Sequence, residues 1–297
     1  MTAVANVRQP DDRSAVRPPT LRLPTLLGAA SLEVPARERA VDACRHLLPP
    51  GTTIHVRHAS GDTTHGIVGA AARLARAGFV PVPHVAARAL ESFTRLNDYL
   101  ARGAGEAGVA EILVTAGDRP QPAGPYRSSL DVIETGLFER HGIRRVGVAG
   151  YPERHPAIAT AALDAARAAK LARLRQGGLE PYVVTQLCLD AAPIVAWIAA
   201  ARAAGVDCAI RVGLAGPATV ATLAKFAVRC GVGISLRALA RGQTSVARLT
   251  REAGPEPILR ALARADAPLD GLHFFSFGGV ARTAAWLGAA ARGDFPL

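Results

Sequence analysis

Polar residues that could do chemistry recur in this sequence at the ends of short apolar segments. Each stands at the carboxyl end of a segment rich in aliphatic residues, or within a few residues of it. They are Glu33, Arg57, His58, His84, Asp118, Tyr151 and Gln186. Carboxylates and imidazoles can transfer protons, and an amide can donate and accept hydrogen bonds at once. If the segments are parallel strands of a closed barrel, all of these side chains project into one mouth, where barrel enzymes carry their active sites.

The segment 183–190 shows this pattern most clearly. Its β-branched and aliphatic residues predict a strand buried on both faces, as in a parallel sheet. Asp190 stands where the N-cap of a helix over residues 191–204 is expected. Gln186 then lies near the carboxyl end of the strand, where its amide suits the edge of a pterin or an amide. Gln186 could equally satisfy nearby backbone groups.

Eight apolar segments alternate with helical patterns and predict the fold. The segments are residues 29–34, 53–58, 79–85, 110–115, 145–150, 182–187, 208–213 and 272–276. Helical patterns between them include residues 67–77, 92–102, 130–140, 158–176, 218–229 and 257–265. This alternation favours an α/β fold, a single-domain (β/α)8 TIM barrel. A doubly wound open sheet is the alternative, although no GxGxxG motif follows a strand. The connection over residues 218–271 is expected to hold two helices.

Length and composition set the domain organisation. The chain has 297 residues, of which 49% are hydrophobic, enough for one large core. Residues 1–22 contain prolines among charged residues and are expected to form a flexible N-terminal arm, with the catalytic barrel over residues 23–297. The net charge of +11 raises the possibility of nucleic-acid binding. The arginines are spread over alanine-rich helical segments without interleaved aromatics, so solvated helix faces are the better interpretation and no nucleic-acid partner is expected.

The cysteines and the apolar runs indicate the compartment. Cys44, Cys188, Cys208 and Cys230 have neither CxxC spacing nor a histidine at ligand spacing. We therefore expect no metal site, and interpret the cysteines as buried residues in a reducing compartment. Neither an apolar run of membrane-spanning length nor a signal peptide is evident. A cytoplasmic protein without a membrane partner is expected.

Several short motifs together resemble one enzyme family. Those with the most specific order and spacing are Tyr151-Pro152-Glu153 followed by His155-Pro156, and Thr185-Gln186. The others are Ser31-Leu32-Glu33, Pro83-His84, Gly117-Asp118, Ala149-Gly150, Asp190, Lys225-Phe226-Ala227 and His273-Phe274-Phe275. With these motifs the chain resembles the methylenetetrahydrofolate reductase family, flavin-dependent barrel enzymes of one-carbon metabolism. The resemblance runs from about residue 29 to 290.

The resemblance implies a reaction and roles for its residues. In the family, NADH or NADPH reduces FAD, which passes hydride to 5,10-methylenetetrahydrofolate and gives 5-methyltetrahydrofolate. Glu33 matches the general acid, and Asp118 an aspartate that contacts both flavin and pterin. Gln186 matches a pterin-binding glutamine, and Arg282 lies near the position of a substrate-binding arginine. Burial in the barrel mouth would raise the pKa of Glu33. Asp118 could instead cap a helix, and Glu33 could be a surface residue.

The cofactor-binding set is partly retained and partly altered. The residues implied to bind cofactor are Arg57, His58, His84, Gly117, Tyr126, Arg127, Tyr151, His155, Asp164 and Arg175. Four of them, Arg57, His58, Arg127 and Arg175, replace other family residues or are substitutes for them. Ala116 stands where the family has an arginine, and Val220 where it has an aromatic residue. The family also includes flavin-free members. We therefore expect FAD, with weaker support than for the folate chemistry.

The expected function follows from these matches. It is methylenetetrahydrofolate reductase-like transfer of hydride from NAD(P)H through FAD, or the reverse reaction in one-carbon catabolism. The expected partners are a folate substrate and a nicotinamide cofactor, and the sequence is compatible with a homo-oligomer. A folate-binding barrel without reductase activity, with a regulatory or partner-binding role, is the alternative.

Overall fold

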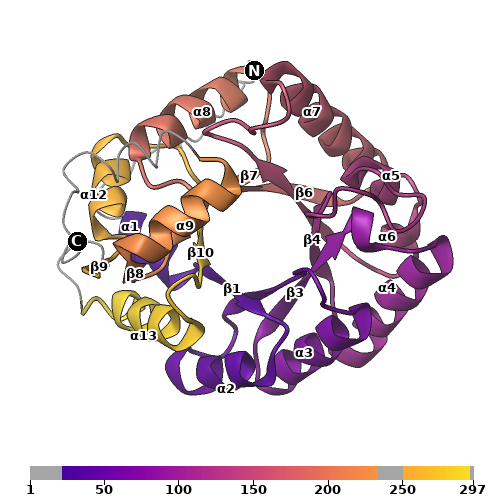
Figure 1. The fold of residues 1–297 in the computed structure, drawn as a ribbon, viewed down its shortest axis with the longest axis horizontal. Coiled ribbons are helices and arrows are strands. Elements are labelled where there is room, and N and C mark those ends of the chain that lie inside the picture. The colour runs from indigo at the N-terminus through magenta and orange to yellow at the C-terminus, as the bar shows by residue number, and fades with distance from the viewer. Residues whose placement is uncertain (1–21, 233–249, 295–297) are drawn as a thin grey trace, which may run out of the picture.

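All eight predicted strands are present, and they close into a barrel (Figure 1). The computed structural model describes residues 22–232 and 250–294. The predicted arm therefore lies, except for its last residue, outside the described residues. The barrel strands are β1 Ser31–Pro35, β2 Thr53–Arg57, β3 Val80–Ala86, β4 Glu111–Thr115, β5 Arg145–Gly150, β6 Glu180–Thr185, β7 Ala209–Ala215 and β10 Gly271–Phe275. Neighbouring strands are parallel throughout, and β10 closes the ring against β1. The expected single-domain TIM barrel is confirmed.

The main hydrophobic core lies between the strands and the surrounding helices. Outward-facing residues such as Leu32, Ile54 and Ile112 are fully buried there. Because side chains alternate along a strand, the residues between them point into the barrel. This alternation explains why the strands read as nearly continuous apolar segments while their inner faces can hold polar residues.

Helices surround the barrel, and most match the predicted patterns (Figure 1). They are α1 Arg22–Gly28, α2 Glu38–Leu47, α3 Thr64–Arg76, α4 Phe93–Ala107, α5 Ser129–Ile133, α6 Leu137–Arg140, α7 Thr160–Gln176, α8 Ala191–Ala203, α9 Val220–Cys230, α12 Glu256–Arg264 and α13 Val280–Ala291, with a 3₁₀ turn over Ala87–Ala89. The helix predicted over residues 130–140 is broken into α5 and α6. Gly136 between them has a φ of 70°, which an α-helix does not tolerate. Asp190 caps α8 as predicted, accepting from the backbone N–H of Ala192 at 3.1 Å.

The long connection before β10 contains α9 and α12 in its described parts, so the predicted number of two helices is not tested over the whole connection. A short antiparallel pair, β8 Ala218–Thr219 with β9 Glu252–Ala253, ties its ends together. Residues 233–249 lie outside the described part of the chain. None of the described helices is both long and apolar enough to cross a membrane.

The amino-terminal end of the barrel interior is filled by an ionic cluster. Arg211 on β7 reaches across to Glu111 on β4, with its Nη1 2.7 Å from Oε1. Arg145 on β5 binds the other carboxylate oxygen at 3.0 Å. The Arg211 guanidinium stacks over the ring of the fully buried Tyr182, 4.2 Å from its centroid. Tyr182 in turn fits against Gly147, where a Cβ atom would lie 2.5 Å from the ring. These residues form the floor of the barrel.

Candidate active site

Glu33 lies at the carboxyl end of β1, between two buried imidazoles. Its side chain is 12% exposed, and its Oε2 lies 3.5 Å from Nε2 of His273 on β10. The same oxygen lies 3.9 Å from Nε2 of His84 on β3. Ser276 fixes the backbone here by donating from its hydroxyl to the Glu33 carbonyl at 2.7 Å. The carboxylate thus lies at the mouth beside groups from two other strands, β3 and β10, and the loop after β10 fixes its backbone.

Ser31 extends this arrangement into the barrel. Its hydroxyl lies 2.9 Å from Nδ1 of His273 and donates to the carbonyl of Leu272 at 3.3 Å. Ser31 and Glu33 are two residues apart on β1 and therefore share its inner face. Nε2 of His273 is buried and makes no hydrogen bond in the described part of the chain, although Oε2 of Glu33 lies only 3.5 Å from it. One proton shared between these two atoms would join them. Glu33 and His273 therefore form a pair that can hold a transferable proton.

A third imidazole, from His55 on β2, lies below this pair. Its Nδ1 lies 3.2 Å from Nε2 of His84, and its ring packs edge-on against His273 with centroids 4.5 Å apart. Burial lowers the pKa of His84 to about 4, although the charge of Glu33 partly opposes this shift. Burial, with the neighbouring positive charges, lowers the pKa of His55 well below its usual value. His55 and His84 are therefore uncharged at neutral pH.

The expected rise in the pKa of Glu33 is wrong. Burial does raise it, as the sequence argument assumed. The hydrogen bond with His273 and the charges of His84, His273 and Arg57 act in the opposite direction and lower the pKa of Glu33 overall. His84, His273 and Arg57 lie on other strands than Glu33, so the sequence around Glu33 does not reveal them. Glu33 therefore favours the carboxylate form.

The histidines and Glu33 do not form a metal site. Within residues 22–232 and 250–294, no three His, Cys, Asp or Glu side chains converge as a set that could hold a metal ion. Their nitrogens are instead directed at one another and at Ser31. The chemistry that this arrangement supports is proton transfer.

Gln186 directly follows β6 and contacts the helix that covers this side of the mouth. Its Nε2 donates to the carbonyl of Cys230, the last residue of α9. Its Oε1 is buried and has no hydrogen-bond partner among the described residues. Leu223 and Ala227 pack α9 onto Leu187 and its neighbours at the carboxyl ends of the strands. The alternative that Gln186 satisfies a backbone group is therefore half right, because one acceptor atom remains available for a ligand.

Asp118 follows β4 and faces the same, carboxyl-terminal end of α9. Its side chain is 80% exposed, and its Oδ2 lies 3.6 Å from Nη2 of Arg229. Burial and the charge of Asp118 both raise the pKa of Tyr151, so these two side chains are near each other. Burial raises the pKa of the Cys230 thiol to about 11, and the charges of Asp118 and Glu33 add to that rise. Asp118, Glu33 and Tyr151 thus lie around one opening. His155 packs edge-on against Tyr151 at 5.6 Å.

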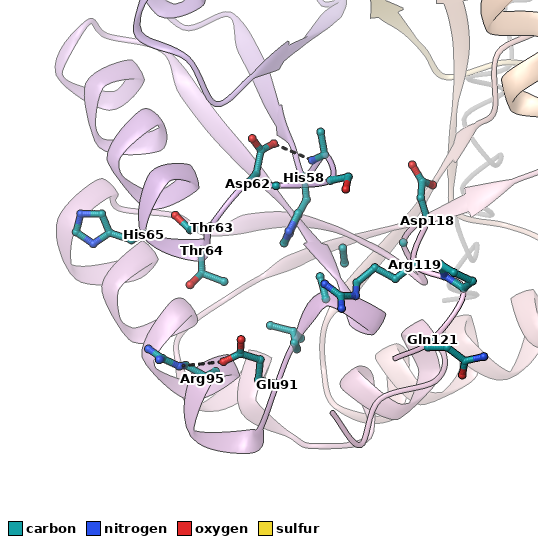
Figure 2. A pocket seen from close by; sticks show the side chains of 18 residues that line it. His58, Asp62, Thr63, Thr64, His65, Glu91, Arg95, Asp118, Arg119 and Gln121 are labelled. Carbon is teal, nitrogen blue, oxygen red and sulfur yellow. Dashed lines mark hydrogen bonds and ion pairs between the residues drawn. The ribbon is translucent and has the colours of Figure 1, made fainter. Parts of the chain in front are cut away.

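A cavity of about 650 Å³ opens beside the mouth (Figure 2). Figure 2 shows side chains of the β2–α3 connection facing those of the β4–α5 connection. The lining includes His58, Asp62, Thr63, Arg95, Asp118 and Arg119. Nδ1 of His58 is buried without a hydrogen-bond partner in the described part of the chain. Gly117 is also required here, because its φ of 85° and the Ala86 Cβ at 3.1 Å exclude a larger residue. The size and polarity of the cavity are those of a small-molecule site.

A profile of the methylenetetrahydrofolate reductase family matches residues 39–275. That range covers well over half of the chain. The chain belongs to the methylenetetrahydrofolate reductase family. The matched range begins after β1, so the structure adds Glu33 to the site through its contacts with His84 and His273. This family consists of oxidoreductases of folate metabolism, so the family match supports a folate-related oxidoreductase.

Among solved structures, a dihydropteroate synthase from Thermus thermophilus is similar to the chain. The two share 14% sequence identity over 88% of this chain and 91% of that one, with a TM-score of 0.46. Similarity of this extent carries no information on function.

The connection that holds Tyr126 and Arg127 is fixed by a different arginine. Arg88 donates to the carbonyls of Arg127 at 2.9 Å and Arg119 at 3.2 Å. Tyr126 is buried in the main hydrophobic core, whereas the side chain of Arg127 is exposed and does not line the cavity. Contacts of these two residues with a cofactor stay predictions, and the Arg127 side chain lies outside the cavity lining.

Three further predicted site residues are engaged elsewhere. Arg175 lies at the last turn of α7, at the opposite end of the barrel from the mouth, and pairs with Asp207. This placement contradicts the predicted role of Arg175, because a 17-residue helix spans roughly 25 Å. Asp164 lies in the first part of α7, near the mouth, but its carboxylate pairs with Arg167 at 2.8 Å. Arg282 binds Glu252 of β9 at 2.7 Å. Asp164 and Arg282 could each contact a ligand only by leaving its ion pair.

Sequence reasoning gave no role to Ser31, His55 and His273. Ser31 and His273 belong to motifs that carry the family resemblance, but the sequence does not show that they contact each other. A usable signal was present, since Ser31 stands two residues before Glu33 and His55 two before Arg57. Polar residues at alternate positions of an otherwise apolar strand share its inner face. The predicted Arg57 acts electrostatically on Glu33 and His84 from this face.

Proposed function

We propose that the protein is a methylenetetrahydrofolate reductase-like oxidoreductase, which transfers hydride from NADH or NADPH, through FAD, to 5,10-methylenetetrahydrofolate, or catalyses the reverse. The observation that carries this proposal is the Glu33–His273–Ser31 chain at the barrel mouth. Reduction of the methylene group needs a proton at the nitrogen that leaves the carbon. A carboxyl group that shares a proton with an imidazole can supply it in one direction and accept it in the other.

Glu33 acts as the acid in reduction and as the base in oxidation. The lowered pKa favours the carboxylate in the free protein, which suits acceptance of a proton in the oxidation direction. In reduction, a bound ligand that excludes water from the mouth would oppose this shift and favour the acid form. His273 stays beside Glu33 in both directions and can return the proton.

Gln186 and Asp118 bind the folate in this proposal. The free Oε1 of Gln186 accepts from an N–H of the pterin, a pairing that a buried acceptor without a partner favours. Val220, which replaces the family's aromatic residue, has no aromatic ring on which a ligand could stack. Phe226 on α9 stacks on Phe277 with centroids 3.9 Å apart and is the nearest aromatic substitute on the same helix.

The residues present fit a dinucleotide cofactor in part. The cavity beside the mouth, with His58, Asp118 and Arg119 in its lining, would hold the arm of FAD or NAD(P)H. His84 and Tyr151 would meet the ring portion nearer the barrel axis. The cofactor supplies the hydride, while these residues orient it and exclude water. Asp164 would join only by leaving Arg167, and Arg175 is excluded by its position.

Turnover measurements test the proposal. Purified protein is assayed for oxidation of NADH and of NADPH with methylenetetrahydrofolate, and for oxidation of 5-methyltetrahydrofolate with an electron acceptor. The visible absorption spectrum of the same sample shows whether flavin is bound. We expect turnover in at least one direction. Folate binding without turnover under all of these conditions, with FAD added, would overturn the proposal.

That result would favour the second candidate, a folate-binding barrel with a regulatory or partner-binding role. The observation that supports it is the engagement of Asp164 and Arg282 in ion pairs away from the cavity. In this case Gln186→Leu should weaken folate binding, while Glu33→Gln should leave folate affinity nearly unchanged.

A further inference from the structure

His55 is completely buried beneath the mouth and touches both imidazoles that flank Glu33. Its Nδ1 lies 3.2 Å from Nε2 of His84, and the two rings meet edge-on with centroids 5.4 Å apart. It also packs edge-on against His273. A polar ring that is sealed from water and hydrogen-bonded to one site residue is placed to control that residue.

The two nitrogens of His55 have different surroundings, and this decides which one carries the proton. Nε2 is buried without a hydrogen-bond partner among the described residues. An N–H group at this atom would be an orphaned buried donor, which folded proteins avoid more strictly than an unmet acceptor. The proton of neutral His55 therefore resides on Nδ1, which donates to Nε2 of His84.

This donation fixes the tautomer of His84. A neutral imidazole has one N–H, so an Nε2 that accepts from His55 leaves the proton on Nδ1. Nδ1 of His84 makes no hydrogen bond to another residue of the described chain, and it is not one of the buried polar atoms that lack a partner. We propose that His55 is a positioning residue, which holds His84 as an Nδ1–H donor toward the ligand in the mouth.

The proposal specifies the ligand atom that meets His84. It is an acceptor, such as a carbonyl oxygen or an unprotonated ring nitrogen, and not an N–H group. The proposal also leaves Nε2 of His84 without a proton to donate to the Glu33 carboxylate, whose Oε2 lies 3.9 Å away. These consequences for the ligand rest on the proposed function, but the tautomer itself does not.

The charged groups around the pair agree with two uncharged rings. Arg57, His58 and His273 oppose a positive charge on His84, while Glu33 favours one. Burial outweighs that attraction. For His55, burial is joined by His273, His84 and Arg211, all of which oppose a charge. The donor and acceptor roles therefore follow from neutral tautomers at pH 7.

Nitrogen-15 NMR of the histidine rings tests the tautomer directly, because pyrrole-type and pyridine-type nitrogens have distinct shifts. The full-length protein is measured at pH 7, and the His84 signals are assigned by their loss in His84→Asn. We expect Nδ1 of His84 to be pyrrole-type and its Nε2 pyridine-type. The opposite pattern, or a doubly protonated ring, would overturn the proposal. This measurement needs no enzymatic activity, so it stands even where the reductase assay fails.

Two substitutions of His55 separate its hydrogen bond from its volume. His55→Leu fills the space without a donor, and the proton of His84 should move to Nε2, facing Glu33. His55→Asn keeps a donor on the atom after Cγ, as Nδ1 does, and should retain the original tautomer. In the folate assay, kcat/KM should fall about 10-fold in His55→Leu, the effect of one lost hydrogen bond, and recover to within about 3-fold of wild type in His55→Asn. An unchanged His84 tautomer in His55→Leu would overturn the proposal.

Discussion

At Glu33, exchange of the carboxyl group for an amide keeps the shape of the side chain and removes the transferable proton. Glu33→Gln should lower folate turnover by about 10²–10⁴-fold, the usual contribution of a positioned acid or base. Steady-state kinetics with methylenetetrahydrofolate measure the effect. Glu38→Gln, the same change at an exposed position on α2, is the control and should be neutral. Near-normal turnover in Glu33→Gln would remove Glu33 from the mechanism.

The lowered pKa of Glu33 also predicts opposite pH dependences for the two directions. Reduction uses the protonated acid, so its kcat/KM should fall by about tenfold for each pH unit above the pKa of Glu33. Oxidation uses the carboxylate and should not fall over this range. Rate profiles between pH 5 and pH 8 test both statements. A reduction rate that stays level up to pH 7 would show that the free protein keeps Glu33 protonated.

At the scale of single strands, a glycine on β5 makes room for the aromatic floor. A Cβ atom at Gly147 would lie 2.5 Å from Cζ of Tyr182 and 2.8 Å from Cδ1 of Leu113. Gly147→Ala should therefore destabilise the protein by about 1–3 kcal/mol through overpacking. Gly105→Ala on α4, where a Cβ meets nothing within 4 Å, should instead stabilise it by about 0.5–1 kcal/mol. Urea unfolding of the two variants measures both signs, and equal effects would contradict this account.

The strands could be predicted from the sequence because their outer faces supply apolar residues at every second position. Their inner faces were harder to interpret, since Arg211 and Glu111 lie in nearly apolar segments yet meet across the barrel. Pairing between residues so far apart in the chain leaves no local pattern. Helix breaks were also missed, because Gly136 was included in one continuous pattern.

Glu33, Asp118 and Gln186 were predicted to lie in or shortly after the carboxyl end of a strand, and the structure places them there, while their roles stay predictions. The prediction failed for Arg175, since position along a helix decides which end of the barrel a side chain reaches. It was incomplete for His55 and His273, whose role depends on contacts between non-adjacent segments. Cofactor roles for the remaining residues stay predictions.

For the whole molecule, the buried neutral histidines predict sensitivity to acid. The unfolded chain binds a proton at His84 below a pKa of about 6.5, whereas the folded protein does so only near 4. The contribution of neutral His84 to the free energy of unfolding is therefore complete above a pH of about 6.5 and is lost as the pH falls toward 4. The loss from His84 is roughly 3 kcal/mol. Urea unfolding at pH 7 and pH 4 measures it, with His84→Asn expected to reduce the loss and the exposed His46→Asn to leave it unchanged. Equal losses in both variants would contradict the assignment.

The ionic cluster of Glu111, Arg145 and Arg211, with Tyr182, fills the amino-terminal end of the barrel interior, opposite the mouth. Water that reaches His55, His273 or Glu33 from outside must then pass the same opening as the ligands. Once a ligand covers that opening, these groups no longer exchange protons with the solvent until the ligand leaves. Any proton that Glu33 takes up or releases must then be exchanged with the solvent while that opening is still uncovered.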